Sequence, residues 1–226
     1  MLGGVGCERG DAVGRPECVR AVVFDFDGTL CDTELKNVML CQNVLHELGA
    51  DVPLRELEVT LTGGDDLVTV PPLLEKHGAH GTIDDYERLR DHCYRTYAEA
   101  DLALEPGARE LLETLRGRGV RLGVASMTFS RCILTALNRL GVLRLFDAVV
   151  CGDMVARRKP DPEPYLTALG YLGVAPEDAV VFEDSPTGIA AGKAAGCHVV
   201  GYTGCAISQD VSAADEVTDT FVGLGL

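Results

Sequence analysis

The stretch AVVFDFDGTLCDTE, residues 21–34, decides how this chain folds. Its first four residues are apolar or small, as in a strand that is buried on both faces. Asp25 and Asp27 follow, and because side chains along a strand alternate with period two, both carboxylates point the same way. Two carboxylates so close repel each other, and burial adds a desolvation penalty. A solvated turn explains Asp27-Gly28 but not Asp25 between two phenylalanines, whereas a bound divalent cation such as Mg²⁺ explains both.

Four further apolar runs are similar to this first strand. They lack polar alternation, which is typical of parallel strands covered on both faces. Segments with apolar residues at helical spacing lie between them, so strand and helix alternate along the chain. This alternation predicts an α/β fold with a doubly wound, Rossmann-like parallel sheet. The predicted strands are 21–24, 120–125, 148–151, 179–182 and 198–202, and the predicted helices are 106–119, 130–141, 161–173 and 187–196.

The interval 33–104 breaks this alternation, because it carries helical signals and no convincing strand. It is too long and too periodic for a loop, and it predicts a small helical cap domain inserted after the first strand. This insertion point places the cap over the carboxyl edge of the sheet, where open α/β sheets bind ligands. We expect 20–32 and 105–226 to form the α/β core, and the glycine-rich residues 1–19 to form a flexible extension.

Two segments of the cap carry specific local signals. The helical segment 82–100 begins with Thr82 and Asp85, which have the spacing of a capping box. The segment 66–78 contains Pro71-Pro72, and these prolines predict that it divides into two shorter pieces.

Composition excludes several classes of partner. The net charge is −15, which argues against nucleic acid and against an anionic membrane surface. No run of 18 apolar residues predicts a transmembrane helix, and residues 1–19 lack the apolar region of a signal peptide. The nine cysteines are scattered without a CxxC pair, which favours small core residues over a zinc site. We therefore expect a reducing, cytoplasmic location. The sequence does not indicate an oligomeric state.

Four motifs in order along the chain carry a resemblance to a known family. DFDGTL (25–30) has the DxDGT form, VASMT (124–128) supplies a strand-end serine, RRKPDPEPY (157–165) supplies a K-P-x-P lysine, and VFEDSPTGIAAGKAAG (181–196) supplies an acidic pair. Together they resemble the haloacid dehalogenase (HAD) superfamily, mostly phosphohydrolases, and in particular members with a helical cap after the first strand. The resemblance covers about residues 20–205.

The resemblance implies a role for each matched residue. Asp25 is the nucleophile that becomes an aspartyl phosphate, and Asp27 is the general acid for the leaving alcohol and then the base for water. The implied cofactor is Mg²⁺, held by Asp25, by the backbone carbonyl of Asp27 and by Asp184, while Glu183 holds a metal-bound water. Lys159 neutralises Asp25 and the phosphoryl oxygens in the transition state.

The implied phosphate-binding groups are the hydroxyl of Ser126, the amide of Met127 and Lys159. Met127 departs from the family pattern, in which Asn or Ser often follows the serine. The departure is harmless if only the amide binds phosphate, and otherwise it reshapes the wall of the pocket.

The implied activity is hydrolysis of a small phosphorylated metabolite. A sugar-phosphate mutase similar to β-phosphoglucomutase is the alternative. That mutase has a histidine on the first cap helix and an arginine in the second cap segment, whereas this chain has Asn37 and LTGGDDL (61–67) there, which favours hydrolysis. A non-catalytic binding protein is disfavoured because the key positions hold competent residues. Carbon–halogen cleavage is disfavoured because it does not need Asp27.

The candidates for substrate specificity lie in the cap: Asn37, Gly64 and Asp65. Paired glycines permit the backbone to approach a ligand, although a plain turn between cap helices is the simpler interpretation. An aspartate at 65 or 66 that faces the site favours a hydroxyl-rich leaving group, so a sugar or polyol phosphate is preferred to phosphoglycolate. The resemblance also implies cap opening and closing, with hinges near 32–34 and 104–107.

Overall fold

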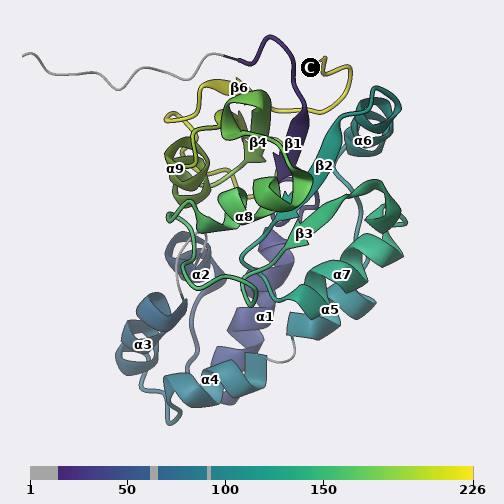
Figure 1. The fold of residues 1–226 in the computed structure, drawn as a ribbon. Helices are drawn as coiled ribbons and strands as arrows, with labels where there is room; N and C mark the ends of the chain where they lie inside the picture. The colour runs from purple at the N-terminus through teal and green to yellow at the C-terminus, as the bar shows by residue number, and fades with distance from the viewer. Residues whose placement is uncertain (1–14, 62–65, 91–92, 226) are drawn as a thin grey trace, which may run out of the picture.

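A parallel sheet of six strands forms the centre of the molecule (Figure 1). The computed structural model describes residues 15–61, 66–90 and 93–225. All five strand pairs are parallel, and β1 lies inside the sheet between β2 and β4. The spatial order is β3-β2-β1-β4-β5-β6, and the bounds are β1 Ala21–Phe24, β2 Arg121–Ala125, β3 Ala148–Val150, β4 Ala179–Glu183, β5 His198–Tyr202 and β6 Glu216–Thr218.

Helices cover both faces of this sheet. In β1, Val22 and Phe24 belong to a hydrophobic cluster that includes residues of α6 and α7, whereas Ala21 and Val23 belong to a cluster with residues of α8 and α9. All four side chains are fully buried, which explains why the strand has no polar alternation. The predicted doubly wound α/β class is therefore confirmed. The bounds are α6 Ala108–Gly117, α7 Ser130–Arg139, α8 Glu163–Leu172 and α9 Pro186–Ala194, with short 3₁₀ helices at Leu143–Leu145 and Pro176–Asp178.

The sixth strand was not predicted. β6 has three residues and pairs with β5 at the edge of the sheet, where Val217 is exposed. It lacks the apolar run by which the other strands were found, because one side of an edge strand faces solvent.

Five helices lie between β1 and α6 in the described part of the chain, and no strand interrupts them. Four of them contribute to a hydrophobic cluster of their own, with Leu45, Leu57, Leu74 and Tyr86 among its buried members. Thr82 and Asp85 form the predicted capping box at the start of α4. The bounds are α1 Glu34–Glu47, α2 Leu54–Leu61, α3 Asp66–Lys76, α4 Ile83–Leu89 and α5 Cys93–Glu99. The segment predicted as one helix over 82–100 thus contains two helices.

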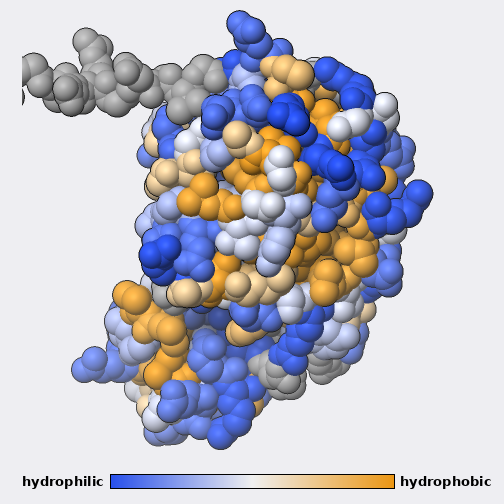
Figure 2. All heavy atoms as spheres, viewed as in Figure 1, coloured by the Kyte–Doolittle hydropathy of each residue, from blue (hydrophilic) through white to orange (hydrophobic). Residues whose placement is uncertain are grey.

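The prediction that Pro71 and Pro72 divide the segment 66–78 was wrong, because α3 runs through both prolines. Each proline lacks the amide that would bond the carbonyl four residues earlier, on Leu67 or Val68. Both of these residues are exposed, so water can reach this side of the helix. Figure 2 shows a group of orange, hydrophobic residues over the region of α3.

The helix α5 is attached to the sheet side of the molecule as well as to the other cap helices. Tyr97 belongs to the same cluster as Val22 and Phe24, and its ring centroid lies 6.4 Å from that of Phe26. Arg139 of α7 donates hydrogen bonds to the carbonyls of Tyr97 at 2.8 Å and Ala100 at 2.9 Å. Figure 1 shows α5 alongside α7. The proposed cap boundary of 33–104 stays a prediction, and α5 bridges the two parts.

Three other expectations concern residues 1–19, the cysteines and a membrane-spanning helix. Of the predicted extension 1–19, the structure describes residues 15–19, where Val19 packs on the cluster around Phe24. Six of the seven cysteines with described side chains are buried, as expected of small core residues. No helix in the described ranges is long and apolar enough to span a bilayer.

Phe221 connects the C-terminal segment to the sheet, which gives a test of the packing. Its ring stacks on Tyr202 at 4.6 Å between centroids and meets Phe182 edge-on at 5.5 Å. We expect Phe221→Ala to lower the free energy of unfolding by about 3–5 kcal/mol, because the cavity left in the core cannot fill. Its neighbour Val222 is 64% exposed, so Val222→Ala should change stability by less than about 0.5 kcal/mol. Urea denaturation measures both, and equal effects would contradict this account of the core.

Candidate active site

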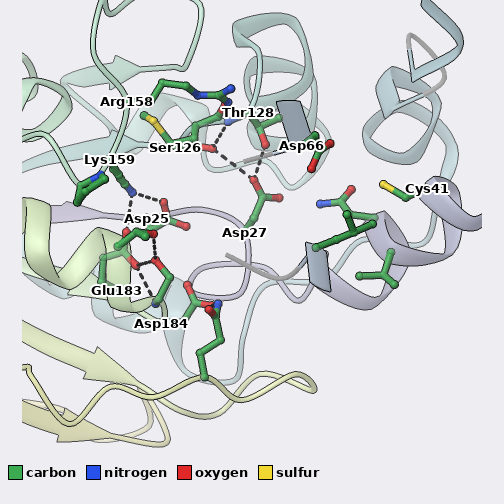
Figure 3. Close-up of a pocket in the computed structure, with 18 of the residues that line it drawn as sticks. Asp25, Asp27, Cys41, Asp66, Ser126, Thr128, Arg158, Lys159, Glu183 and Asp184 are labelled. Atoms are coloured by element: carbon green, nitrogen blue, oxygen red, sulfur yellow. Dashed lines mark hydrogen bonds and ion pairs between the residues drawn. The ribbon is translucent and has the colours of Figure 1, made fainter. Parts of the chain in front are cut away.

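The predicted site residues lie together at the carboxyl ends of neighbouring strands (Figure 3). Asp25 and Asp27 follow β1, Ser126 and Met127 follow β2, and the acidic pair stands at the end of β4. Lys159 reaches them from the loop between β3 and α8. These residues line one cavity of about 410 Å³, whose opposite wall comes from the interval 33–104 that was predicted to form a cap. The cap residues in that wall are Asn37, Val38, Cys41, Leu61, Asp66 and Arg90.

Lys159 is the buried cation of the site. Its ammonium donates hydrogen bonds to Asp25 Oδ1 at 2.5 Å, to Glu183 Oε1 at 2.6 Å and to the carbonyl of Ala125 at 2.8 Å. It also lies 4.8 Å from the ring centroid of Tyr165. Burial alone would lower the pKa of this ammonium, but the charges of Asp25 and Glu183 outweigh burial and raise the pKa. Lys159 is therefore charged at neutral pH.

Negative charge around Asp25 exceeds what this lysine balances. Burial is the largest cause that raises the pKa of the Asp25 carboxyl, and the Glu183, Asp184 and Asp27 charges raise it further, while Lys159 opposes them. Three of its four charged neighbours are thus carboxylates. Such a cluster of hard oxygen donors fits Mg²⁺, which takes one or two carboxylates and keeps waters.

The backbone at Gly28 makes room for one of these carboxylates. Gly28 has a φ of +80°, and a Cβ atom there would stand 2.4 Å from Asp184 Oδ2. Asp184 Oδ1 accepts a hydrogen bond from Thr29 at 3.0 Å, and Oδ2 accepts one from Gln209 at 3.2 Å. In the described residues, no three His, Cys, Asp or Glu side chains are grouped as a metal site. The predicted magnesium ligands are two carboxylates and a backbone carbonyl, so they remain compatible with this finding.

Glu183 holds its neighbours in place through both oxygens. Its Oε1 accepts from Lys159 and from the Tyr165 hydroxyl at 2.9 Å, and its Oε2 accepts from the Ser185 amide at 3.0 Å and the Ser185 hydroxyl at 2.9 Å. The side chain is 1% exposed, and a Cβ on Gly188 would stand 1.7 Å from it. In this structure Glu183 fixes Lys159 and the start of α9. Its predicted contact with a metal-bound water remains a prediction.

Hydroxyl groups surround the carboxylate of Asp27. Oδ1 accepts from Thr33 and, at 2.7 Å, from Tyr97, while Oδ2 accepts from Thr128 at 2.8 Å and Ser126 at 3.3 Å. Burial raises the pKa of the Tyr97 phenol well above its usual value, with a smaller contribution from the charge of Asp27, so this group remains a proton donor. Asp27 thus has donors from both the sheet side and the cap side.

The predicted phosphate-binding groups lie at the wall of the cavity. The Ser126 hydroxyl accepts a hydrogen bond from the Thr128 amide at 3.0 Å, which places the hydroxyl between β2 and Asp27. Met127 lines the cavity, and its carbonyl accepts from Arg158 at 2.7 Å. Their contacts with phosphate remain predictions.

Of the three predicted specificity residues, the structure describes Asn37. Asn37 lines the cavity and donates from Nδ2 to the Tyr97 hydroxyl at 3.0 Å, while its Oδ1 is buried without a partner. Gly64 and Asp65 lie outside the described residues. Asp66 does face the cavity, but Arg90 pairs with it at 2.7 Å. Because Arg90 balances its charge, Asp66 gives less support to a hydroxyl-rich leaving group than an unpaired aspartate would.

Sequence reasoning missed several residues that contact the site. Thr128 stands within the quoted VASMT motif and could have been found there. Thr33 and Arg158 likewise lie within the quoted stretches AVVFDFDGTLCDTE and RRKPDPEPY. Arg90, Tyr97 and Gln209 come from segments that are distant in sequence and carry no local signal. The missed residues are Thr33, Arg90, Tyr97, Thr128, Arg158 and Gln209.

A doubly wound sheet with an acidic cluster at its carboxyl edge is the arrangement expected of the hydrolase class that the sequence motifs indicated. Residues 22–202 match the model of the haloacid dehalogenase-like hydrolase family, and the chain belongs to that family. The predicted resemblance is confirmed, and the chain is an enzyme of a hydrolase family whose relatives are named as phosphatases.

Three similar proteins cover most of the chain. The phosphorylated carbohydrates phosphatase of Thermotoga maritima is 36% identical over 79% of this chain and 82% of its own length. The phosphoglycolate phosphatase of Nitrosospira multiformis is 32% identical over 81% of this chain and 83% of its own. The crystal structure of a CbbY variant from Rhodobacter sphaeroides with xylulose-(1,5)bisphosphate is 30% identical, with a TM-score of 0.80 over 92% of this chain and 96% of that one.

Two glycines allow the role of the space beside Asp184 to be tested. Gly28→Ala and Gly78→Ala both place a side chain at positive φ, +80° and +67°, which costs about 1–2 kcal/mol in each case. Only the Cβ at 28 would meet Asp184, since nothing lies within 4 Å of the one at 78. We expect Gly28→Ala to slow hydrolysis of p-nitrophenyl phosphate by about 100-fold, as a displaced site group does, and Gly78→Ala to leave the rate unchanged. A full rate in Gly28→Ala would contradict this account.

Proposed function

We propose that this protein is a Mg²⁺-dependent phosphatase that hydrolyses a small phosphorylated metabolite through an aspartyl phosphate on Asp25. The observation that carries the proposal is the contact between Lys159 and Asp25 inside a cluster of carboxylates. A buried lysine beside a carboxylate at the carboxyl edge of a sheet can bind a phosphoryl group, whose charge is spread over three oxygens. The cavity of about 410 Å³ is within the usual size range for small-molecule sites.

The first chemical step uses Asp25, Asp27 and Lys159. A carboxylate oxygen of Asp25 attacks phosphorus, the bond to the leaving oxygen breaks, and Asp27 supplies the proton that this oxygen needs. Lys159 stabilises the phosphoryl oxygens, and the Ser126 hydroxyl and Met127 amide donate hydrogen bonds to them. Mg²⁺, when bound to Asp25, Asp184 and the carbonyl of Asp27, supplies positive charge that offsets these acids and the phosphoryl group.

The second step releases phosphate. Water attacks phosphorus, the bond to the Asp25 oxygen breaks, and Asp27 takes the proton from water. Asp27 thereby returns to the protonated form with which the first step began, so that one residue serves as acid and then as base.

A sugar or polyol phosphate is the favoured substrate class. Asn37 Oδ1 lies buried on the cap side of the cavity without a donor, and a substrate hydroxyl would satisfy it. The relative named as a phosphorylated carbohydrates phosphatase and the CbbY structure with a sugar bisphosphate agree with this class. Arg90 and Arg158 in the cavity wall also allow an anionic leaving group, so phosphoglycolate is the comparison to assay.

A mutase is the second candidate. Among the described residues, none that lines the cavity is a histidine, whereas the mutase in the resemblance uses one from the first cap helix. Release of inorganic phosphate without a bisphosphate primer distinguishes a phosphatase from a mutase, which needs the primer to isomerise a sugar phosphate.

Asp25→Asn tests the nucleophile. The amide cannot form the aspartyl phosphate, so we expect phosphate release to fall below detection while the urea denaturation curve stays cooperative. Wild-type enzyme quenched in acid during turnover should gain the mass of one phosphoryl group on the peptide that contains Asp25. Turnover by Asp25→Asn at the wild-type rate would refute the assignment.

Asp27→Asn tests the acid–base role through the leaving group. An alkyl phosphate needs a proton on its leaving oxygen, whereas p-nitrophenolate leaves without one. We expect kcat/KM to fall by about 10²–10⁴-fold for glycerol phosphate and by much less for p-nitrophenyl phosphate. Equal losses for the two esters would remove general acid catalysis from the proposal.

A further inference from the structure

We propose that Tyr97 is a positioning residue that holds the Asp27 carboxylate in the orientation needed for proton transfer to the leaving group. The inference rests on the proposed function, because it takes Asp27 as the general acid and base. Tyr97 lies 70 positions from Asp27 in sequence, and its hydroxyl donates to Asp27 Oδ1 at 2.7 Å.

The ring of Tyr97 is held rigidly. It is 1% exposed, belongs to the cluster of the sheet core and packs against Phe26, which stands between the two catalytic aspartates in sequence. The backbone of α5 is fixed from the other side, because Arg139 donates to the carbonyls of Tyr97 and Ala100. The hydroxyl therefore reaches Asp27 from an element that is packed on two sides.

A second hydrogen bond of the Tyr97 hydroxyl indicates where the hydroxyl proton points. Asn37 Nδ2 can only donate, and it donates to the Tyr97 oxygen at 3.0 Å. The proton of Tyr97 is thereby left to point at Asp27. The order Asn37 to Tyr97 to Asp27 makes each hydrogen bond polarise the next.

The four hydroxyl groups divide between the two oxygens of Asp27. Thr128 and Ser126 hold Oδ2 from the β2 side, and Thr33 and Tyr97 hold Oδ1 from the cap side. Without the Tyr97 hydroxyl, Thr33 would be the one of these four hydroxyl groups that still donates to Oδ1. The carboxylate can then rotate, and a general acid must stay within hydrogen-bond reach of the leaving oxygen.

Tyr97→Phe and Tyr202→Phe form a matched pair for the test. Both side chains are 1% exposed, and both hydroxyls donate to a carboxylate at 2.7 Å, that of Tyr202 to Glu105. Both variants keep the ring and remove one buried donor, so the loss of stability should be similar. Neither tyrosine lines the cavity of the site, and they differ in that Tyr97 contacts Asp27 whereas Tyr202 contacts Glu105.

The readout compares glycerol phosphate with p-nitrophenyl phosphate for each variant, in the full chain with Mg²⁺. We expect Tyr97→Phe to lower kcat/KM about tenfold for glycerol phosphate, which corresponds to one hydrogen bond to a charged group, and less than about threefold for p-nitrophenyl phosphate. KM should change little, and Tyr202→Phe should leave both esters at wild-type rates.

The outcomes distinguish a failure of the positioning role of Tyr97 from a failure of the proposed function. Equal losses for the two esters in Tyr97→Phe, or a Tyr97→Phe variant that matches Tyr202→Phe, would overturn the positioning role while leaving the phosphatase in place. If the wild-type enzyme released no phosphate from either ester, or if Asp27→Asn did not discriminate between them, the proposed function itself would be wrong, and the role of Tyr97 with it.

Discussion

The attraction between the Lys159 ammonium and the carboxylates of Asp25 and Glu183 is the interaction on which the site depends. Parallel pairing of β1 with β4 brings the acids that follow these strands to one edge of the sheet, where burial makes their mutual repulsion costly. Lys159, 4% exposed, comes from a different loop and balances part of this charge. A buried ion pair seldom adds net stability, but removal of its cation would leave unpaired buried acids. The excess of acid that remains favours a bound cation, and such a cation together with Lys159 would offset the negative charge of a phosphoryl group there.

Bond cleavage and substrate choice are assigned to different structural elements. The groups proposed to act on phosphorus follow β1, β2 and β4 or stand in the β3–α8 loop, and the register of the sheet fixes their relative positions. The groups that line the opposite wall of the cavity include Asn37 on α1, Asp66 on α3 and Arg90 just after α4. Substitutions on these helices can therefore alter the leaving group that fits without moving the aspartates. This separation agrees with the different substrates named for the similar proteins.

The predictable part of the structure is local in sequence. Apolar runs in the sequence predicted the buried strands, and three of these runs, those of β1, β2 and β4, lead directly to a polar site residue, as β1 leads to Asp25. The prolines of α3 led to a wrong prediction because Val68 is exposed, so that water can reach the side of the helix where the proline amide is missing. Exposure depends on the tertiary structure, and the local sequence does not show it. β6 was missed because an edge strand needs no apolar run. Tyr97 lies in the segment 82–100 that was predicted to be helical, but the sequence did not connect it with Asp27, since 70 residues of chain separate the two and the packing of α5 on α7 brings them together.

The place of α5 has a consequence for any hinge motion of the cap. Because Arg139 ties α5 to α7, and the Tyr97 ring packs in the sheet cluster, α5 is attached to the core although it lies between the predicted hinges at 32–34 and 104–107, and the Tyr97–Asp27 hydrogen bond is expected to persist when the other cap helices move. Asn37 stands on α1, whose neighbours form the separate cap cluster. A displacement of α1 would then lengthen the Asn37–Tyr97 bond first and free the Tyr97 proton to turn away from Asp27. One amide would thus make the orientation of the acid–base group depend on where the cap lies.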